Sequence, residues 1–301
     1  NTKVLDSLFG IINQTMHYLA GDMAKIPIIE SNDEQLVFTI KEYAKKNITL
    51  SKTDWDSFET SWDFKRHPLV DGAGSISEAY DNWKSKANEM FKQLKNNEEE
   101  LNKIFIDIYG LQDELKPEEE DKDVTVHYII DKKEDASENL QKNNYLLTKE
   151  DVIKSFISYA VGCMFGRYSL DVEGLAYAGG EWDESKYKTY PADKDGIIPI
   201  CDNEYFEDDI VSKFVKFVEV VYGEKNLNEN LNFIARALGG KGTSREVIRD
   251  YFLNDFYNDH CRTYQKRPIY WLFKSGKKNG FNCLIYMHRY QPDTIARIRT
   301  D

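Results

Sequence analysis

The chain has 301 residues, of which 41% are hydrophobic and 13% aromatic, and its formal net charge is −12. This apolar content excludes an intrinsically disordered chain, and the length corresponds to about two domains. The negative charge excludes a protein that coats nucleic acid over its whole surface, so any DNA contact must come from a local basic face. No run of about 18 apolar residues is present, so we expect a cytoplasmic protein without a membrane span.

The cysteines and the chain ends also limit the class of protein. The four cysteines are far apart and form no CxxC pair, which indicates reduced thiols rather than a disulfide framework or a zinc site. The chain begins at Asn1 without a Met and stops at Asp301 within sequence that we expect to be ordered. We therefore expect a piece of a longer protein.

In the first half, apolar residues recur at helical spacing over 2–13 and 34–47, and a long helix is predicted over 77–109. Ser75 or Ser77 can cap the long helix, and residues 96–97 can interrupt it. Pro27 favours a loop that leads to an edge strand.

Residues 54–64 combine aromatic and acidic side chains in an unusual density. We expect a packed loop in which four aromatic side chains fill a small satellite core, with base stacking as the alternative. These side chains are Trp55, Phe58, Trp62 and Phe64.

The middle of the chain is polar and acidic. Residues 98–123 contain eleven acidic and three basic side chains, which is typical of a solvated face. A strand is predicted over 124–130, and the polar stretch 131–144 is the best candidate for a boundary. We therefore divide the chain into 1–30, an N-terminal segment; 31–144, a helical spacer; and 145–301, a C-terminal helical domain with the basic hairpin described below.

The second half is predicted to be mainly helical, over 149–165, 204–222, 227–238 and 244–264. Thr148 is the expected N-cap of the first of these helices. The glycine-rich stretch 239–244 invites comparison with a phosphate-binding loop, but its spacing departs from that motif. A glycine helix stop followed by a Ser or Thr cap explains every residue.

The apolar runs 268–273 and 281–290 predict a β-hairpin, because Asn279 and Gly280 suit the turn between them. A further helix is expected after Pro292. The fold class is therefore α+β and predominantly helical, with helical-bundle elements and a small antiparallel hairpin near the C-terminus.

The same region is the basic part of the chain. Residues 262–299 contain nine Lys or Arg and one acidic residue, whereas the whole chain is acidic. This segment is suited to phosphate contacts, with solvation or intramolecular ion pairing as the alternative. The candidate DNA-binding residues are Lys266, Arg267, Lys274, Lys277, Lys278, Arg289, Arg297 and Arg299.

No catalytic constellation emerges. The sequence lacks the Asn/Asp-Pro-Pro-aromatic motif of amino-methyltransferases. Asp171 with residues 184–186 matches a nuclease pattern, and such matches arise by chance in a chain with 31% charged residues. A set of His and Cys residues near the C-terminus fits no metal-site spacing, so we expect neither catalytic nor metal residues. This set is His260, Cys261, Cys283 and His288.

Four stretches resemble a known family. Residues 54–69 (DWDSFETSWDFKRHPL), 205–211 (YFEDDIV) and 264–273 with 275–281 (YQKRPIYWLF, SGKKNGF) resemble the C-terminal half of PglX-type adenine-specific DNA methyltransferases of BREX phage-defence systems. Residues 104–111 (IFIDIYGL) are similar to a helix end in large adenine methyltransferases.

The resemblance implies a parent enzyme that transfers a methyl group from S-adenosylmethionine to adenine N6, with its catalytic domain upstream of this region. Residues 1–30 resemble the end of a target-recognition domain, although Gln14 stands where Pro is common. We expect a non-catalytic region without a cofactor of its own that contributes double-stranded DNA binding and scaffolding. The alternative is an interaction module for other BREX proteins or for a phage inhibitor.

Overall fold

The computed structural model describes residues 2–12, 20–70, 72–276 and 281–300, and this part of the chain forms two compact units. Unit 1 contains the chain up to Trp55 together with residues 84–146, and unit 2 contains residues 56–83 together with the chain from Leu147 onward. The long helix α4 (Ile76–Tyr109) begins in unit 2 and continues into unit 1. The division at residues 30 and 144 stays a prediction about domains, and the compact units group residues 56–83 with the C-terminal half.

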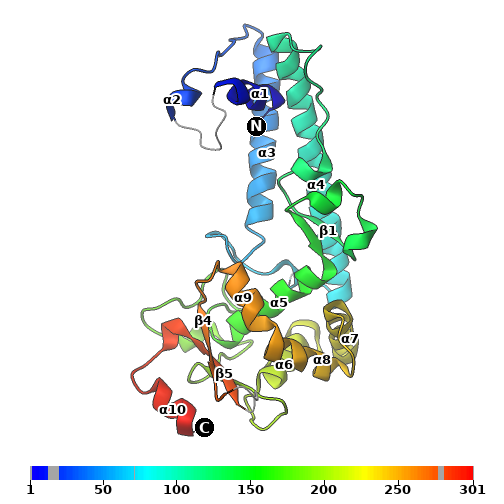
Figure 1. Cartoon of the computed structure of the whole chain (residues 1–301). Coiled ribbons are helices and arrows are strands. Elements are labelled where there is room, and N and C mark those ends of the chain that lie inside the picture. The colour runs from blue at the N-terminus through cyan, green and yellow to red at the C-terminus, as the bar shows by residue number, and fades with distance from the viewer. Residues whose placement is uncertain (1, 13–19, 71, 277–280, 301) are drawn as a thin grey trace. The chain divides into compact units, whose positions relative to one another are not determined.

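Unit 1 is built on α3 (Glu34–Trp55) and the second part of α4, which lie side by side (Figure 1). Asn97 Nδ2 donates to Asn47 Oδ1 over 2.8 Å. The predicted interruption at residues 96–97 is wrong, because an Asn costs a helix well under about 1 kcal/mol and tertiary packing outweighs this. The other elements of unit 1 are α1 (Lys3–Ile12), α2 (Ala20–Met23) and β1 (Tyr128–Ile130). Strand β2 (Leu146–Thr148) begins at Leu146, which is the last residue of unit 1.

Two strand predictions for unit 1 need correction. The described residues 24–33 contain no strand, so the edge strand near Pro27 is wrong. The strand predicted over 124–130 is reduced to β1, because Val124 and Val126 are buried in a small core with Phe91. The Asn88 side chain pairs with both backbone polar groups of Ile129, at 2.7 and 2.9 Å, as a neighbouring strand would.

Unit 2 is mainly helical, as expected. Thr148 and Thr243 form capping boxes with Asp151 and Glu246, and Gly239 ends a helix at a φ of 78°. The prediction of a helix stop and cap at residues 239–244 is therefore confirmed. The helices are α5 (Lys149–Met164), α6 (Ile210–Tyr222), α7 (Leu227–Leu238), α8 (Ser244–Asn254), α9 (Phe256–Thr263) and α10 (Thr294–Thr300).

Two of these helices differ from their predicted bounds. The helix expected from residue 204 begins at Ile210, because Asp209 Oδ1 accepts hydrogen bonds from the backbone N–H groups of Val211 and Ser212. The helix expected over 244–264 is divided at Asp255 into α8 and α9.

The predicted hairpin is confirmed as β4 (Tyr270–Lys274) and β5 (Asn282–Tyr286), which pair antiparallel. Its turn, with Lys277 and Lys278, lies outside the described residues. β3 (Ile197–Ile200) adds a third antiparallel strand that the sequence did not reveal, in the order β3-β5-β4. Pro199 is tolerated because β3 is an edge strand.

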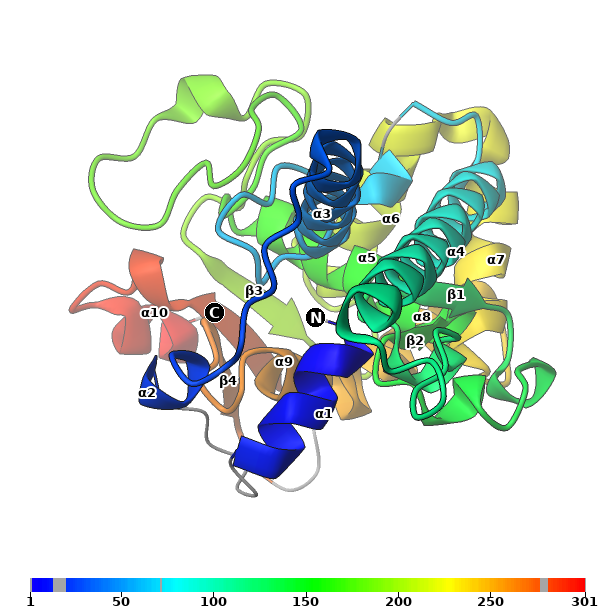
Figure 2. The same ribbon diagram turned by 90° about the horizontal axis from the view of Figure 1, so that it is seen from above.

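Helix α5 is the centre of unit 2, with ten buried residues. In both views the sheet and the α7–α8 pair lie on opposite sides of α5 (Figures 1 and 2). Just past its C-terminus, Phe165 stacks on Tyr270 of β4 at 5.1 Å between ring centroids. The predicted α+β class is confirmed. Among the described residues, no helix has the length and apolarity that a bilayer crossing requires.

Candidate functional site

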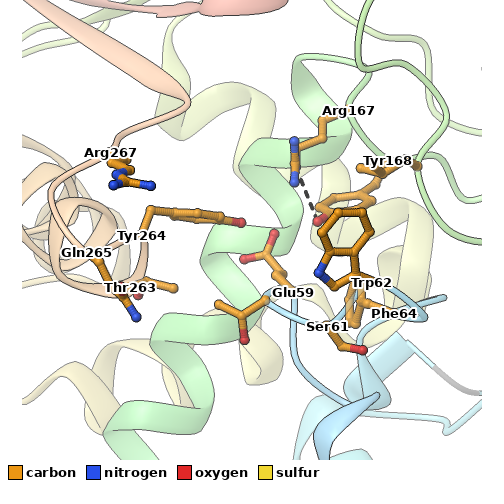
Figure 3. A pocket seen from close by; sticks show the side chains of 12 residues that line it. Glu59, Ser61, Trp62, Phe64, Arg167, Tyr168, Thr263, Tyr264, Gln265 and Arg267 are labelled. Atoms are coloured by element: carbon orange, nitrogen blue, oxygen red, sulfur yellow. Dashed lines mark hydrogen bonds between the residues drawn. The ribbon is translucent and has the colours of Figure 1, made fainter.

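Unit 2 contains a hollow of about 590 Å³ that is lined by three segments far apart in the sequence (Figure 3). The segments are residues 59–64, residues 167–175 and residues 263–267. We call this hollow the aromatic pocket, because Trp62, Phe64, Tyr168 and Tyr264 line it.

Local backbone geometry brings each segment to the pocket. Phe64 anchors the first segment with an edge contact to the Tyr168 ring, at 5.4 Å between centroids. Gly166, with a φ of 77°, turns the chain after α5 and leads into the second segment. The third segment ends α9 with Gln265 and Lys266 at φ values of 52° and 64°, a conformation that costs about 1–2 kcal/mol for a side-chain-bearing residue.

The carboxylate of Glu59 lies at the centre of the pocket (Figure 3). Its Oε2 accepts a hydrogen bond from Ser158 Oγ over 2.5 Å. Its Oε1 is buried and has no partner of hydrogen-bond geometry among the described residues. Burial raises the pKa of Glu59, and the Ser158 hydrogen bond, the Arg167 charge and the Tyr168 hydroxyl oppose that rise.

Two further polar groups face this carboxylate. The hydroxyl of Tyr264 is buried beside the Tyr168 hydroxyl, and no group of the described chain meets it in full hydrogen-bond geometry. Burial and then the Glu59 charge raise its pKa above the ordinary value, so it stays a neutral phenol. Arg167 Nε donates to the Tyr168 hydroxyl over 3.2 Å, which holds the guanidinium beside the pocket.

The predicted satellite core of residues 54–64 is only partly present. Phe64 is buried, and Phe58 packs on Trp83 at 5.8 Å between centroids. Trp62 is 101% exposed and Trp55 is 52% exposed, so neither fills a core. Sequence reasoning could not separate these four aromatic residues, because burial of a loop side chain depends on residues distant in the chain.

The predicted DNA-binding residues fall into different environments. Lys266, Arg267, Lys274 and Arg299 are exposed and form no ion pair with any residue that the structure describes. Arg267 also lines the aromatic pocket.

Arg289 and Arg297 have partners within the chain. Arg289 donates to the backbone carbonyls of Asp193 and Lys194 over 2.6 and 2.7 Å, and its guanidinium lies 4.2 Å from the Trp182 ring centroid. These contacts connect distant loops and use one donor on each terminal nitrogen of the guanidinium. Arg297 pairs with Asp293 over 2.8 Å.

The catalytic and metal-binding patterns weighed in the sequence have structural explanations. The Asp171 carboxylate accepts hydrogen bonds from the backbone and hydroxyl of Thr189. His260 Nε2 accepts from the backbone N–H groups of Ile269 and Tyr270 over 3.0 and 3.2 Å. Within the described ranges, no group of three or more His, Cys, Asp or Glu side chains could hold a metal ion.

Two curated proteins match the entire chain. It is 45% identical over 310 aligned positions to "Adenine-specific methyltransferase PglX" of Lacticaseibacillus casei (strain Zhang) and 39% identical over 315 positions to "Adenine-specific methyltransferase BrxX" of Escherichia coli O9:H4 (strain HS). The chain is therefore similar along its whole length to PglX-type adenine-specific methyltransferases. It spans 24% and 25% of the length of these two relatives. No family model matches it.

The predicted resemblance to PglX-type methyltransferases is therefore confirmed. Of the four stretches that carried it, residues 54–69 and 264–273 each contribute a wall of the aromatic pocket. The stretch 205–211 contains Asp209, the N-cap of α6. These stretches were recognisable from the sequence, but the meeting of 54–69 and 264–273 at one pocket was not.

Proposed function

We propose that this chain is the C-terminal, non-catalytic region of a cytoplasmic, S-adenosylmethionine-dependent adenine-N6 DNA methyltransferase of a BREX phage-defence system, where it helps the enzyme hold double-stranded DNA. Similarity along the whole chain to two adenine-specific methyltransferases supports this assignment. Because the chain spans about a quarter of each relative, methyl transfer and cofactor binding are assigned to the parent enzyme.

One observation carries the DNA-binding part of the proposal. Lys266, Arg267, Lys274 and Arg299 are exposed, and none forms an ion pair with a described residue, in a chain of net charge −12. Exposed cations without carboxylate partners can bind phosphates and release counterions at little cost. We refer to these four residues as the unpaired cations. Lys277 and Lys278 remain predicted contacts of the same kind.

The test is fluorescence anisotropy of a fully paired DNA duplex at several salt concentrations. Replacing all four unpaired cations by Glu is expected to weaken binding at least tenfold and to reduce the salt slope by about 0.9 for each phosphate that the variant no longer neutralises. The control variant replaces Lys45, Lys103, Lys142 and Lys216 by Glu, which changes the net charge equally. These four lysines are exposed and already pair with carboxylates.

The expected outcome is that the control variant keeps most of the affinity. Equal losses in both variants would show that only the overall charge matters, and unchanged binding in the first variant would remove the unpaired cations from the DNA contact. Interaction with other BREX proteins or with a phage inhibitor remains the alternative prediction, and a lack of duplex binding by the unmodified chain would favour it.

A further inference from the structure

The floor of the aromatic pocket has two polar atoms whose hydrogen bonding is incomplete. Glu59 Oε1 and the Tyr264 hydroxyl are both buried, and neither has a partner of hydrogen-bond geometry among the described residues. A buried polar group without a partner costs about 1–3 kcal/mol, so such groups are rare unless a ligand or water completes them. Two such atoms on one pocket floor therefore indicate a binding site.

The charges of the pocket define the class of ligand. Arg167 and Arg267 line it together with one carboxylate, that of Glu59. Aromatic side chains around a carboxylate can also bind a quaternary ammonium group, but two guanidinium groups disfavour a cationic ligand. The part of the ligand that contacts Glu59 and Tyr264 is therefore neutral, and the part that lies near Arg167 and Arg267 can be anionic.

The walls and the rim favour a flat ligand. The Trp62 indole is fully exposed, although an indole of this size is usually largely buried. An exposed indole beside a pocket is a stacking platform for a planar ring, and nucleobases are the common planar ligands that also carry phosphates. A hollow of about 590 Å³ is large enough for a purine nucleotide.

We propose that the aromatic pocket binds an unpaired nucleobase that carries an amino group next to a ring nitrogen, as adenine and cytosine do. Glu59 Oε1 accepts a hydrogen bond from the amino group, the Tyr264 hydroxyl donates to the ring nitrogen, and the Trp62 indole stacks on the base. The base belongs to an unpaired residue of a DNA strand or to a free nucleotide. The inference rests on the proposed function only in taking a nucleic-acid component as the ligand.

The floor discriminates between bases by their hydrogen-bonding edges. Stacked on Trp62 in the same orientation, hypoxanthine and thymine place a carbonyl oxygen against the Glu59 carboxylate and a ring N–H against the Tyr264 hydroxyl, so neither hydrogen bond forms as it does with adenine or cytosine. Sites built for a hydrogen-bond donor reject ligands that lack it, because their own buried acceptor stays unpaired.

The first experiment is calorimetric titration of this chain with dAMP, dIMP, dCMP and dTMP at neutral pH. We expect dAMP to bind about tenfold or more tightly than dIMP, and dCMP than dTMP, from the value of one hydrogen bond to a charged group. Equal affinities within each pair, or no binding by any of the four nucleotides, would overturn the inference.

Variants locate the binding. Trp62→Ala is expected to weaken dAMP binding about tenfold through lost stacking, and it should not affect folding because the side chain is exposed. Trp55→Ala, at an exposed tryptophan of unit 1, is the matched control and should bind as the unmodified chain does. Equal effects of the two substitutions would contradict a site at Trp62.

Glu59→Gln and Tyr264→Phe test the floor. The amide introduced by Glu59→Gln can present either a donor or an acceptor, so this substitution is expected to abolish the preference for dAMP over dIMP rather than to abolish binding. Tyr264→Phe removes one hydroxyl and should weaken dAMP binding about threefold to tenfold. A full preference for dAMP in Glu59→Gln would remove the proposed role of the carboxylate.

DNA duplexes distinguish the source of the base and separate this inference from the proposed function. A duplex with one unpaired adenine should bind more tightly than a fully paired duplex if the base comes from a DNA strand, and Trp62→Ala should remove this gain. Binding of dAMP without such a gain assigns the pocket to free nucleotides. Failure of the proposed function appears in the fully paired duplex and its salt slope, whereas failure of this inference appears in the dAMP and dIMP affinities.

Discussion

Both compact units are built on helices, but the helices bury very different numbers of residues. In unit 1, the 22-residue helix α3 buries one residue, the polar Asp54, which accepts hydrogen bonds from His127. In unit 2, the 16-residue helix α5 buries ten residues, among them Phe156 and Tyr159, whose rings contact other aromatic rings. The aromatic pocket lies in the unit with the dense interior, which is where side chains can be held accurately enough to recognise a ligand.

An ion pair of unit 2 is buried, whereas one of unit 1 is partly exposed, and removing them should give the largest difference in stability between the two units. Asp209 is fully buried and accepts two 2.8 Å hydrogen bonds from the Arg249 guanidinium while it caps α6. Asp209→Ala removes the N-cap of α6 and leaves the mostly buried Arg249 with only the longer 3.6 Å ion pair to Glu204, so the free energy of unfolding of unit 2 should fall by about 3–5 kcal/mol.

The matched substitution in unit 1 is Lys95→Met, which removes a 2.6 Å pair with the partly exposed Asp121. It should cost less than about 1 kcal/mol. Hydrogen exchange of peptides from each unit measures both effects, and similar losses would contradict the contrast between the two interiors.

A second prediction concerns pH. Burial lowers the pKa of His67 to about 3, and burial together with the Arg167 charge lowers that of His260 to about 4. Both values lie below the ordinary value of 6.5, so the unfolded chain binds these protons first and unit 2 loses stability as the pH falls from about 6.5 towards 4. Each histidine contributes up to about 1.4 kcal/mol per pH unit in this window.

Unit 1 should respond in the opposite direction. Burial and the nearby Glu119 raise the pKa of Glu98 from 4.5 to about 7, so its contribution is present below about 4.5 and is lost as the pH rises to 7. Hydrogen exchange between pH 4 and 7, corrected for intrinsic rates, is expected to show the two trends. Glu98→Gln should remove the pH dependence of stability in unit 1 and leave that of unit 2 unchanged. If both units of the unmodified chain changed stability in the same direction with pH, the predicted contrast would be wrong.

The smallest expected effects come from the same substitution at two helical glycines. A Cβ on Gly162 of α5 would lie 2.4 Å from Cδ2 of Tyr168, so Gly162→Ala should destabilise unit 2 by about 1–3 kcal/mol and disturb the pocket. A Cβ on Gly10 of α1 meets nothing within 4 Å, and Gly10→Ala should stabilise unit 1 by about 0.5–1 kcal/mol. Thermal unfolding measures both changes, and a shift of the same sign would contradict the difference in packing.

The sequence by itself determined the local features of this protein. The caps at Thr148 and Thr243, the helix stop at Gly239 and the β4–β5 hairpin depend on residues within a few positions of one another, so their patterns were sufficient. The family resemblance was also recognisable, because it rests on contiguous stretches.

Tertiary structure alone decided the features that join distant residues. The strand β3 pairs with β5 across more than eighty positions, and Arg289 bonds to carbonyls 95 and 96 positions away. The exposure of Trp62 and the isolation of Glu59 Oε1 depend on three segments that meet only in the folded chain. Periodicity and capping describe the backbone of one element, whereas burial and hydrogen-bond satisfaction are properties of the space between elements.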